Sequence, residues 1–200
     1  LLIDEVKPFK PIIAVTSTEP LLYKNIMEFA GYTKSKGVEF HLTTNGYLLP
    51  RFAEEIVNSD IDILSISLDG SPEIHNEIRG RKDSFEKAYE GIKLVEKFKK
   101  EKNKAKPKIN LNYCISDYNY DSLIDFMESI KDLELNSIIF SHLNFVTKEM
   151  AKTHNKLFNK LCPATPSSIS ALDLSKIEIG ILWDQINEIK SKYNPTRTCK

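Results

Sequence analysis

The chain has 200 residues, with 28 Lys and Arg against 28 Asp and Glu, so its formal net charge is zero. Without a field of either sign, the composition favours neither nucleic acid nor an anionic membrane as a partner. No apolar run is long enough to span a membrane, and the three cysteines are too few and too widely spaced for a disulfide framework. These features predict a globular cytoplasmic protein with a sizeable core.

Short β-branched runs alternate with segments of helical periodicity along most of the chain. The predicted strands are residues 12–17, 40–44, 61–69, 109–116 and 137–145. Helices are predicted over 21–35, 51–57, 83–98, 123–130 and 148–161, with a last helix capped by Asp173. We expect the first ten residues to lack regular structure, and residues 69–83 to form a loop that opens the long helix with an Asp83 capping box. The alternation requires parallel strands joined by crossovers.

Two of the predicted strands have a polar face and an apolar face. Ser65, Ser67 and Asp69 alternate with leucine and isoleucine in the third strand, and Asn110 and Asn112 do so in the fourth. An open doubly wound sheet also satisfies the order of elements, but its strands are apolar on both faces. The pattern therefore favours a partial barrel over residues 1–162, whose polar faces line the interior, with a loop and a last helix over 163–200 packing on it.

Local evidence leaves the roles of individual residues open. Glu19, at the tip of the first strand, could hold an ammonium group or act as a base, or it could simply start a helix. Asn45-Gly46 could contact a ligand or only form a tight turn. Arg79 is a candidate anion clamp or an exposed loop arginine, and His75 in the same loop is expected to be solvated. The cysteines and histidines show no metal-ligand spacing.

Three short motifs follow one another at the ends of successive predicted strands. They are Ser17-Thr18-Glu19-Pro20, Thr43-Thr44-Asn45-Gly46 and Ser67-Leu68-Asp69-Gly70, the last followed by His75 and Arg79-Gly80. In this order they resemble the radical S-adenosylmethionine superfamily, in particular the branch that matures peptides, proteins or other metabolites. The resemblance covers roughly residues 11–148 and implies an α/β fold: a splayed (β/α)6 TIM-like partial barrel, with the first strand here in the place of the family's second.

The resemblance also implies a cofactor-binding set. Glu19 would bind the methionyl ammonium of S-adenosylmethionine, while Ser67 and Arg79 would hold its carboxylate. Thr44 would contact the same end or the ribose. Asn112 and the backbone near Leu143 would lie beside ribose and adenine. The set implied for the cofactor is Glu19, Thr44, Asn45, Ser67, Asp69, Arg79, Asn112 and Leu143, and no catalytic residue is assigned.

The chain departs from the family pattern at two places. The Cys-x-x-x-Cys-x-x-Cys loop that binds the family's [4Fe-4S] cluster is absent, and Cys114, Cys162 and Cys199 lie too far apart in sequence to replace it. Ser17 and Thr18 stand where the family has two glycines. We therefore expect a truncated radical enzyme core that is inactive by itself and that self-associates through the exposed edge of its first strand.

The parent enzyme implied by the resemblance would cleave the cofactor reductively and abstract a substrate hydrogen with a 5′-deoxyadenosyl radical. It would need a reductant such as ferredoxin or flavodoxin, and its substrate would be a peptide, a protein or a small molecule, with Tyr113, Cys114 and His142 as candidates to line its pocket. Two alternatives remain. One is a non-redox barrel lyase or isomerase that uses Asp69, Glu19 and His142 as acid–base groups; the other is a non-catalytic, degenerate binding module.

Overall fold

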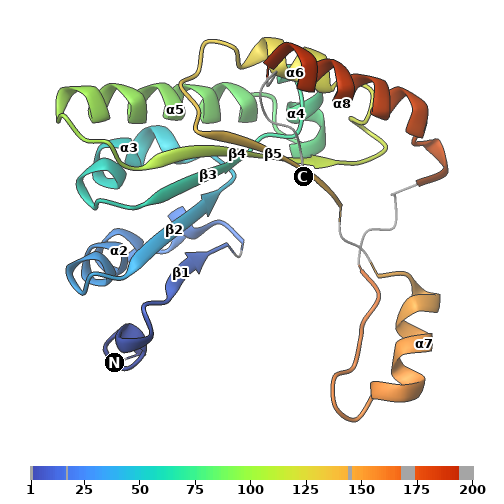
Figure 1. Ribbon diagram of the computed structural model, residues 1–200, viewed down its shortest axis with the longest axis horizontal. Helices are drawn as coiled ribbons and strands as arrows, with labels where there is room; N and C mark the ends of the chain where they lie inside the picture. Colours follow the sequence, from blue (N-terminus) through green and yellow to red (C-terminus); the bar gives the residue numbers. More distant parts are fainter. Residues whose placement is uncertain (1, 17, 144–145, 168–173, 194–200) are drawn as a thin grey trace. The chain divides into compact units, whose positions relative to one another are not determined.

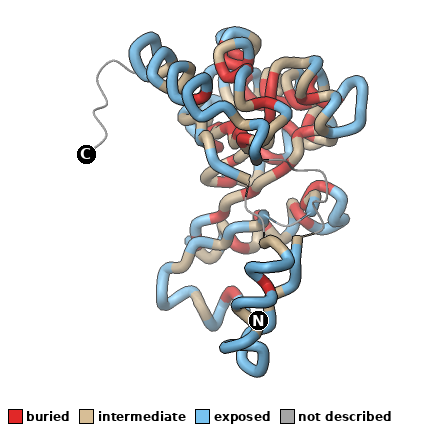
Figure 2. The backbone as a smooth tube through the Cα atoms, turned by 90° about the vertical axis from the view of Figure 1, so that its right-hand side faces the viewer, coloured by how far each residue is buried: buried red, intermediate tan, exposed pale blue. Residues whose placement is uncertain are grey.

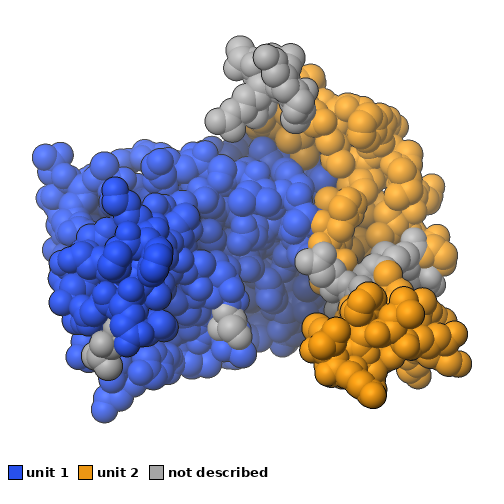
Figure 3. All heavy atoms as spheres, turned by 60° about the horizontal axis from the view of Figure 1, so that its bottom comes forward, with its two compact units in different colours: residues 1–114, 122–141 blue, residues 115–121, 142–200 orange. Residues whose placement is uncertain are grey.

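The computed structural model describes residues 2–16, 18–143, 146–167 and 174–193. It divides into two compact units (Figure 3), of which the first comprises Leu1–Cys114 and Ser122–Ser141 and the second Ile115–Asp121 and His142–Lys200. Each unit is described by itself. Within the described residues, no helix is both long and apolar enough to cross a membrane.

Five strands form one sheet, in the order in which they occur along the chain. The strands are β1 (Ile12–Val15), β2 (Glu39–Thr44), β3 (Ile63–Ser67), β4 (Lys108–Ile115) and β5 (Ser137–His142). The pairs β1–β2, β2–β3 and β3–β4 are parallel. Because each strand returns through a helix to lie beside the previous one, the C-terminal ends of the strands share one edge of the sheet. Over the residues that the structure describes, the sheet stays open and does not close into a barrel.

The helices of the first unit cover one face of this sheet (Figure 1), where α2, α3 and α5 lie side by side. The α-helices are α1 (Leu2–Val6), α2 (Ile26–Ser35), α3 (Leu49–Asn58), α4 (Pro72–Arg79), α5 (Ser84–Glu101), α6 (Leu123–Ser129), α7 (Lys148–Phe158) and α8 (Ile179–Tyr193). Short 3-10 helices are η1 (Lys7–Phe9), η2 (Pro20–Leu22) and η3 (Leu174–Lys176). A Cβ added at Gly91 of α5 would meet the Leu49 Cβ at 2.6 Å, so these two helices approach closely.

The core lies between the sheet and these helices. In β2, β3 and β4, the residues that face the helices are buried, whereas their neighbours in sequence are half-buried or exposed (Figure 2). In β3 and β4, the buried positions are Leu64, Ile66, Ile109, Leu111, Tyr113 and Ile115. The predicted alternation of apolar and polar residues is therefore confirmed. It places Ser65, Ser67, Asn110 and Asn112 on the sheet face opposite the core.

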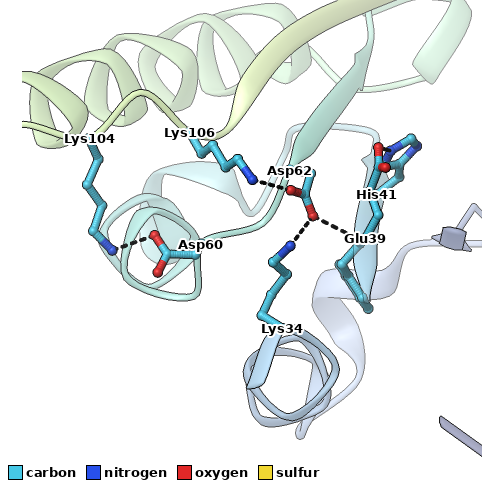
Figure 4. Close-up of polar contacts among 8 residues, drawn as sticks. Lys34, Glu39, His41, Asp60, Asp62, Lys104 and Lys106 are labelled. Carbon is cyan, nitrogen blue, oxygen red and sulfur yellow. Dashed lines mark hydrogen bonds and ion pairs between the residues drawn. The ribbon is translucent and has the colours of Figure 1, made fainter. Parts of the chain in front are cut away.

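Asp62 joins three segments where β2 and β3 begin (Figure 4). One carboxylate oxygen accepts hydrogen bonds from the Phe40 N–H at 2.8 Å and from Lys34 Nζ at 2.5 Å, and the other accepts from Lys106 Nζ at 2.5 Å. Burial by itself would raise the pKa of Asp62, but these hydrogen bonds outweigh it and lower the pKa to about 2. Asp62 thus fixes this end of the sheet, which is the end opposite the candidate site.

In the second unit, α7 and the chain after it are held together by side-chain hydrogen bonds. Thr147 caps α7, because its Oγ1 accepts from the Met150 N–H at 3.0 Å. Asn155 pairs with the backbone of Ala164 through two hydrogen bonds of 2.8 Å. These contacts order the described part of the segment that was predicted to be a loop.

The α/β fold with five parallel strands is confirmed, and three local predictions are wrong. The first ten residues include α1 and η1. Residues 72–79 form α4 rather than a loop, because Pro72 starts the helix and Gly80, with φ of +63°, ends it. Asp83 makes no capping hydrogen bond; Asn76 accepts from the Phe85 N–H instead, at 2.8 Å. The predictions for Ser17, 144–145 and Asp173 lie outside the described residues.

Candidate functional site

Glu19 lies just after β1 and is bound to the end of β2. Pro20 starts η2, and Glu19 caps this 3-10 helix by accepting the Leu21 N–H at 3.0 Å. The same oxygen accepts from Thr44 Oγ1 at 2.7 Å, and the second oxygen accepts from the Asn45 N–H at 2.7 Å. Three donors therefore hold this carboxylate in one orientation.

The turn after β2 is built to supply these donors. Thr44 is 1% exposed, and its hydroxyl also accepts from the Gly46 N–H at 3.0 Å, while Asn45 Oδ1 accepts from the Tyr47 N–H at 2.9 Å. Gly46 has φ of +81°, and a Cβ there would lie 2.6 Å from the Ala88 Cβ. Gly46 is therefore required both by its backbone conformation and by the small space between the turn and α5. The turn predicted from Asn45-Gly46 packs directly against this helix.

Asp69 links the end of β3 to α4 and β4. One oxygen of this buried carboxylate accepts from Arg79 Nη2 at 2.6 Å, and the other accepts from the Cys114 N–H at 3.0 Å. Arg79 is exposed, but it is the last residue of α4 and does not lie in a loop, as the alternative interpretation had it. Asp69 holds the guanidinium in place.

His75 lies one turn before Arg79 on the same helix and is fully buried, so the prediction that it is solvated is wrong. Its Nδ1 accepts the Asp69 N–H at 3.0 Å, which places the imidazole proton on Nε2. Burial, helped by the Arg79 charge, lowers the pKa of His75 to about 4. Within the described residues, Nε2 has no hydrogen-bond partner. His75 thus fastens α4 to the end of β3 as a neutral residue.

A cavity of about 420 Å³ brings these two groups of residues together. Its lining residues are Glu19, Leu22, Asn45, Tyr47, Leu48, Arg79, Arg81 and Ser84. One cavity therefore has a fixed carboxylate and a fixed guanidinium in its walls, as an amino acid zwitterion requires. Its size lies within the range of small-molecule sites.

Sequence reasoning missed five of the eight lining residues, and two of these five, Tyr47 and Arg81, contact each other. The Arg81 guanidinium lies over the Tyr47 ring, 4.0 Å from the ring centroid, and its Nη2 donates to the Tyr47 hydroxyl at 3.1 Å. Each of them directly follows a glycine with positive φ, Gly80 or Gly46. An aromatic residue and an arginine placed beside two such turns were a signal that could have found them.

Ser67 and Asn112 lie on neighbouring strands and are paired in register, although neither is a lining residue of the cavity. Both are half-buried on the polar face of the sheet. Leu143 belongs to the second unit, where its N–H donates to the Ile115 carbonyl at 3.2 Å. His142 ends β5, as predicted, and is exposed. Tyr113 faces the core, 4.8 Å from Phe126 between ring centroids, so it does not line a pocket on the polar face.

Cys114 is poorly suited to ligate an iron–sulfur cluster. Cys114 lies in β4, Cys162 lies in the second unit and Cys199 is outside the described residues. Burial, with the charge of Asp69, raises the pKa of Cys114 and so disfavours the thiolate that a cluster needs. The described residues contain no group of three or more His, Cys, Asp or Glu side chains that could hold a metal.

A family comparison decides the class of this protein. The sequence pattern of the Radical SAM superfamily matches residues 2–130, which is more than half of the chain. The chain belongs to the radical SAM superfamily. Members of this family are enzymes that use S-adenosylmethionine and a [4Fe-4S] cluster. The resemblance inferred from the three motifs is therefore confirmed.

The relatives of this radical SAM chain are longer than the chain. It is 32% identical over 134 residues to AdoMet-dependent heme synthase and 27% identical over 144 residues to Fe-coproporphyrin III synthase, both of Methanosarcina barkeri. It is 28% identical over 144 residues to GTP 3′,8-cyclase of Helicobacter pylori. These matches cover 66%, 71% and 70% of the chain but only 36%, 34% and 42% of the relatives.

Solved structures show the same fold. Streptococcus suis SuiB superimposes with a TM-score of 0.63 at 15% identity, over 96% of this chain and 40% of that one. The structure of anSMEcpe with bound AdoMet and the Kp18Cys peptide gives a TM-score of 0.57 at 19% identity, over 74% and 42%. At these identities the likeness establishes the barrel-like α/β fold.

Proposed function

We propose that the first unit of this radical SAM chain binds the methionyl end of S-adenosylmethionine, with Glu19 on the ammonium and Arg79 on the carboxylate. The observation that carries the proposal is the cavity of about 420 Å³ whose walls contain both residues. Opposite charges fixed in one cavity match a zwitterion, whereas a ligand with only one of the two groups leaves a charge unpaired.

The hydrogen bonds around Glu19 support its assignment. A carboxylate has about four acceptor sites, and the described contacts occupy three of them: two on the oxygen shared by Leu21 and Thr44, and one on the oxygen that binds Asn45. One site is left for an ammonium N–H. In this proposal, Thr44 and Asn45 are positioning residues: they hold the Glu19 carboxylate and do not themselves bind the cofactor.

Arg79 can bind a carboxylate without leaving Asp69. A guanidinium has five N–H groups, and the contact with Asp69 is made through Nη2. Asp69 is therefore a positioning residue in this proposal. Ser67 would add a hydroxyl to the same carboxylate, and Asn112, on the neighbouring strand, would serve the ribose.

The chemistry belongs to the cofactor and to the rest of the protein. When bound, S-adenosylmethionine would supply the radical chemistry that gives the family its name. The residues of this chain would bind and orient its amino acid end. A peptide, protein or small-molecule substrate and a reductant such as ferredoxin or flavodoxin remain part of the proposal.

The geometry argues against the lyase alternative. A general base needs a carboxylate oxygen that can reach a substrate proton. Both oxygens of Asp69 are engaged, by Arg79 and by the Cys114 N–H, so Asp69 is held as a positioning group rather than as a base. Glu19 keeps one acceptor site, and the Arg79 guanidinium in the same cavity favours a zwitterion as its ligand.

Calorimetric titration with S-adenosylmethionine tests the proposal. Replacing Glu19 by Gln removes the charge that pairs with the ammonium, and we expect the affinity to fall at least about tenfold. Glu28→Gln, on the exposed side of α2, is the matched control and should bind as the wild type does. Circular dichroism and thermal unfolding verify that both variants fold. Equal affinity of the wild type and Glu19→Gln would refute the assignment.

A further inference from the structure

Three polar residues that line the cavity of about 420 Å³ have no role in the proposed binding of S-adenosylmethionine. Tyr47 belongs to the turn after β2, Arg81 follows α4, and Ser84 is the first residue of α5. They come from a turn and from the ends of helices, and none of them belongs to a strand of the sheet. We refer to Tyr47, Arg81 and Ser84 as the arginine corner.

The guanidinium of Arg81 is held in the cavity wall with most of its donors unused. It stacks on the Tyr47 ring, 4.0 Å from the centroid, and its Nη2 donates to the Tyr47 hydroxyl at 3.1 Å. Over the parts of the chain that the structure describes, no carboxylate forms an ion pair with Arg81, whereas Arg79 is paired with Asp69. Because a guanidinium has five N–H groups, Arg81 keeps a fork of donors for an oxyanion.

The hydroxyl of Ser84 is a second donor at the same place. Ser84 is only 3% exposed and lines the cavity. Its side chain makes no hydrogen bond to any residue that the structure describes. A buried hydroxyl without a partner is costly, and buried polar groups are normally bonded. Since Ser84 lines the cavity, a ligand in the cavity is the partner that would satisfy it.

The N-terminus of α5 adds a third group of donors. The first four N–H groups of a helix have no partner within the helix, and they form the positive end of its dipole. Asn76 Oδ1 accepts one of them, from Phe85, at 2.8 Å, and Asp83 makes no capping hydrogen bond. The positive end of this helix of 18 residues therefore lies at the cavity wall, where Ser84 lines it.

We propose that the arginine corner and the N-terminus of α5 form a phosphate-binding subsite of the cavity. One guanidinium fork satisfies the two oxygens of a carboxylate, whereas a phosphate group has three acceptor oxygens and also uses the hydroxyl and the helix N-terminus. The phosphate is either free or carried by a small molecule. The inference goes beyond the proposed function, because the subsite uses none of the residues assigned to S-adenosylmethionine.

One neighbouring carboxylate opposes an anion at this subsite. Asp83 Oδ2 accepts a hydrogen bond from the Tyr47 hydroxyl at 3.4 Å. Its negative charge repels phosphate, and the side chain makes no hydrogen bond that caps α5. We expect Asp83→Asn to strengthen phosphate binding about twofold to fivefold. A gain of affinity cannot come from a loss of structure.

The experiment is a ³¹P NMR titration of inorganic phosphate and of methyl phosphate with the full chain at constant ionic strength. We expect saturable binding that Arg81→Gln weakens at least about tenfold and Ser84→Ala about threefold to tenfold. Arg51→Gln, on the exposed side of α3, is the matched control and should bind as the wild type does. Thermal unfolding without phosphate verifies that each variant folds. If Ser84→Ala is destabilised, the exposed Arg81→Gln decides the test.

The outcomes separate the possible sources of phosphate and the two proposals. Tighter binding of methyl phosphate assigns the subsite to a phosphorylated small molecule, and tighter binding of inorganic phosphate assigns it to the free ion; both support the inference. Equal affinity of the wild type and Arg81→Gln, or acetate that displaces phosphate at equal concentration, would overturn it. Phosphate binding without S-adenosylmethionine binding leaves the subsite standing and refutes the cofactor proposal, and the reverse result does the opposite.

Discussion

A single buried histidine connects the charged residues of the candidate site to the rest of the fold. His75 accepts the backbone N–H of Asp69, and Asp69 in turn holds Arg79, which lies four residues after His75 on α4. The imidazole can accept this hydrogen bond only while it is neutral. The position of the guanidinium therefore depends on the protonation state of His75.

This dependence predicts how stability changes with pH. The folded-state pKa of His75 is about 4, below the ordinary value of 6.5, so between these values the unfolded chain binds more protons than the folded one. The contribution of His75 to stability is fully present above pH 6.5 and is lost as the pH falls towards 4, by about 3 kcal/mol in total. Urea unfolding at intervals across this range measures it.

The variant His75→Asn tests the same point, because asparagine keeps an acceptor near the position of Nδ1 but does not titrate in this range. We expect it to flatten the pH dependence between 6.5 and 4, at some cost in packing. NMR titration of the wild-type ring gives a direct reading. A His75 ring that titrates near 6.5 in the folded protein would contradict the account.

Single residues also show what the sequence can predict. Glu19 follows a predicted strand, and Thr44 and Asn45 stand at the end of the next one, all within family motifs, so their meeting at one edge of the sheet was foreseeable. The role of Asp69 was not, because its partner at Cys114 lies 45 residues away in sequence. The burial of His75 was missed because residues 72–79 were interpreted as a loop.

Thr18 illustrates a different limit. Its φ of +51° lies in the left-handed region, which glycine adopts most easily. The sequence showed that a family glycine is replaced at this position, and the structure shows that the backbone keeps the conformation that glycine favours. No propensity scale for threonine predicts this, since the conformation is imposed by the surrounding fold.

At the scale of elements, the site depends on α5 packing against the turn after β2. Gly46 has φ of +81°, and a Cβ at this residue would lie 2.6 Å from the Ala88 Cβ and 3.0 Å from Ile66 Cγ2. The helix thus closes over the turn that presents Asn45 to Glu19. Sequence reasoning found the turn and the helix separately, but only coordinates show that they touch.

The variant Gly46→Ala should therefore be costly in two ways, through its backbone conformation and through the clash with α5. Gly37 is the matched control, because its φ is +73° and nothing lies within 4 Å of an added Cβ. We expect Gly37→Ala to cost about 1 kcal/mol and Gly46→Ala at least about 2 kcal/mol more. Denaturant unfolding of both proteins measures the difference, and equal costs would show that the contact with α5 does not constrain the turn.

At the scale of the whole molecule, the chain belongs to the radical SAM superfamily, but its sequence lacks the Cys-x-x-x-Cys-x-x-Cys loop that binds the family's cluster. Its three cysteines are Cys114, Cys162 and Cys199, in different parts of the sequence. We expect anaerobic reconstitution with iron and sulfide to give no cluster-type absorbance in this chain. A brown protein with a stoichiometric [4Fe-4S] cluster would contradict this reading of the cysteines.

The first strand raises a second prediction at this scale. Within the described residues, β1 is at the edge of the sheet and is paired only with β2, and Ile12 is 55% exposed. An apolar edge strand is a template for association. Light scattering at increasing protein concentration should show self-association, and a monomer at high concentration would contradict it.

The central claim is that Glu19 and Arg79 hold opposite ends of one amino acid zwitterion. Titrating the wild type, Glu19→Gln and Arg79→Lys with S-adenosylmethionine and with its decarboxylated analogue tests it most directly, because Lys keeps the charge of Arg79 beside Asp69 but loses its fork. We predict that Glu19→Gln weakens both ligands, whereas Arg79→Lys weakens S-adenosylmethionine severalfold and leaves the decarboxylated ligand unchanged. Equal loss of both ligands in Arg79→Lys would contradict the claim.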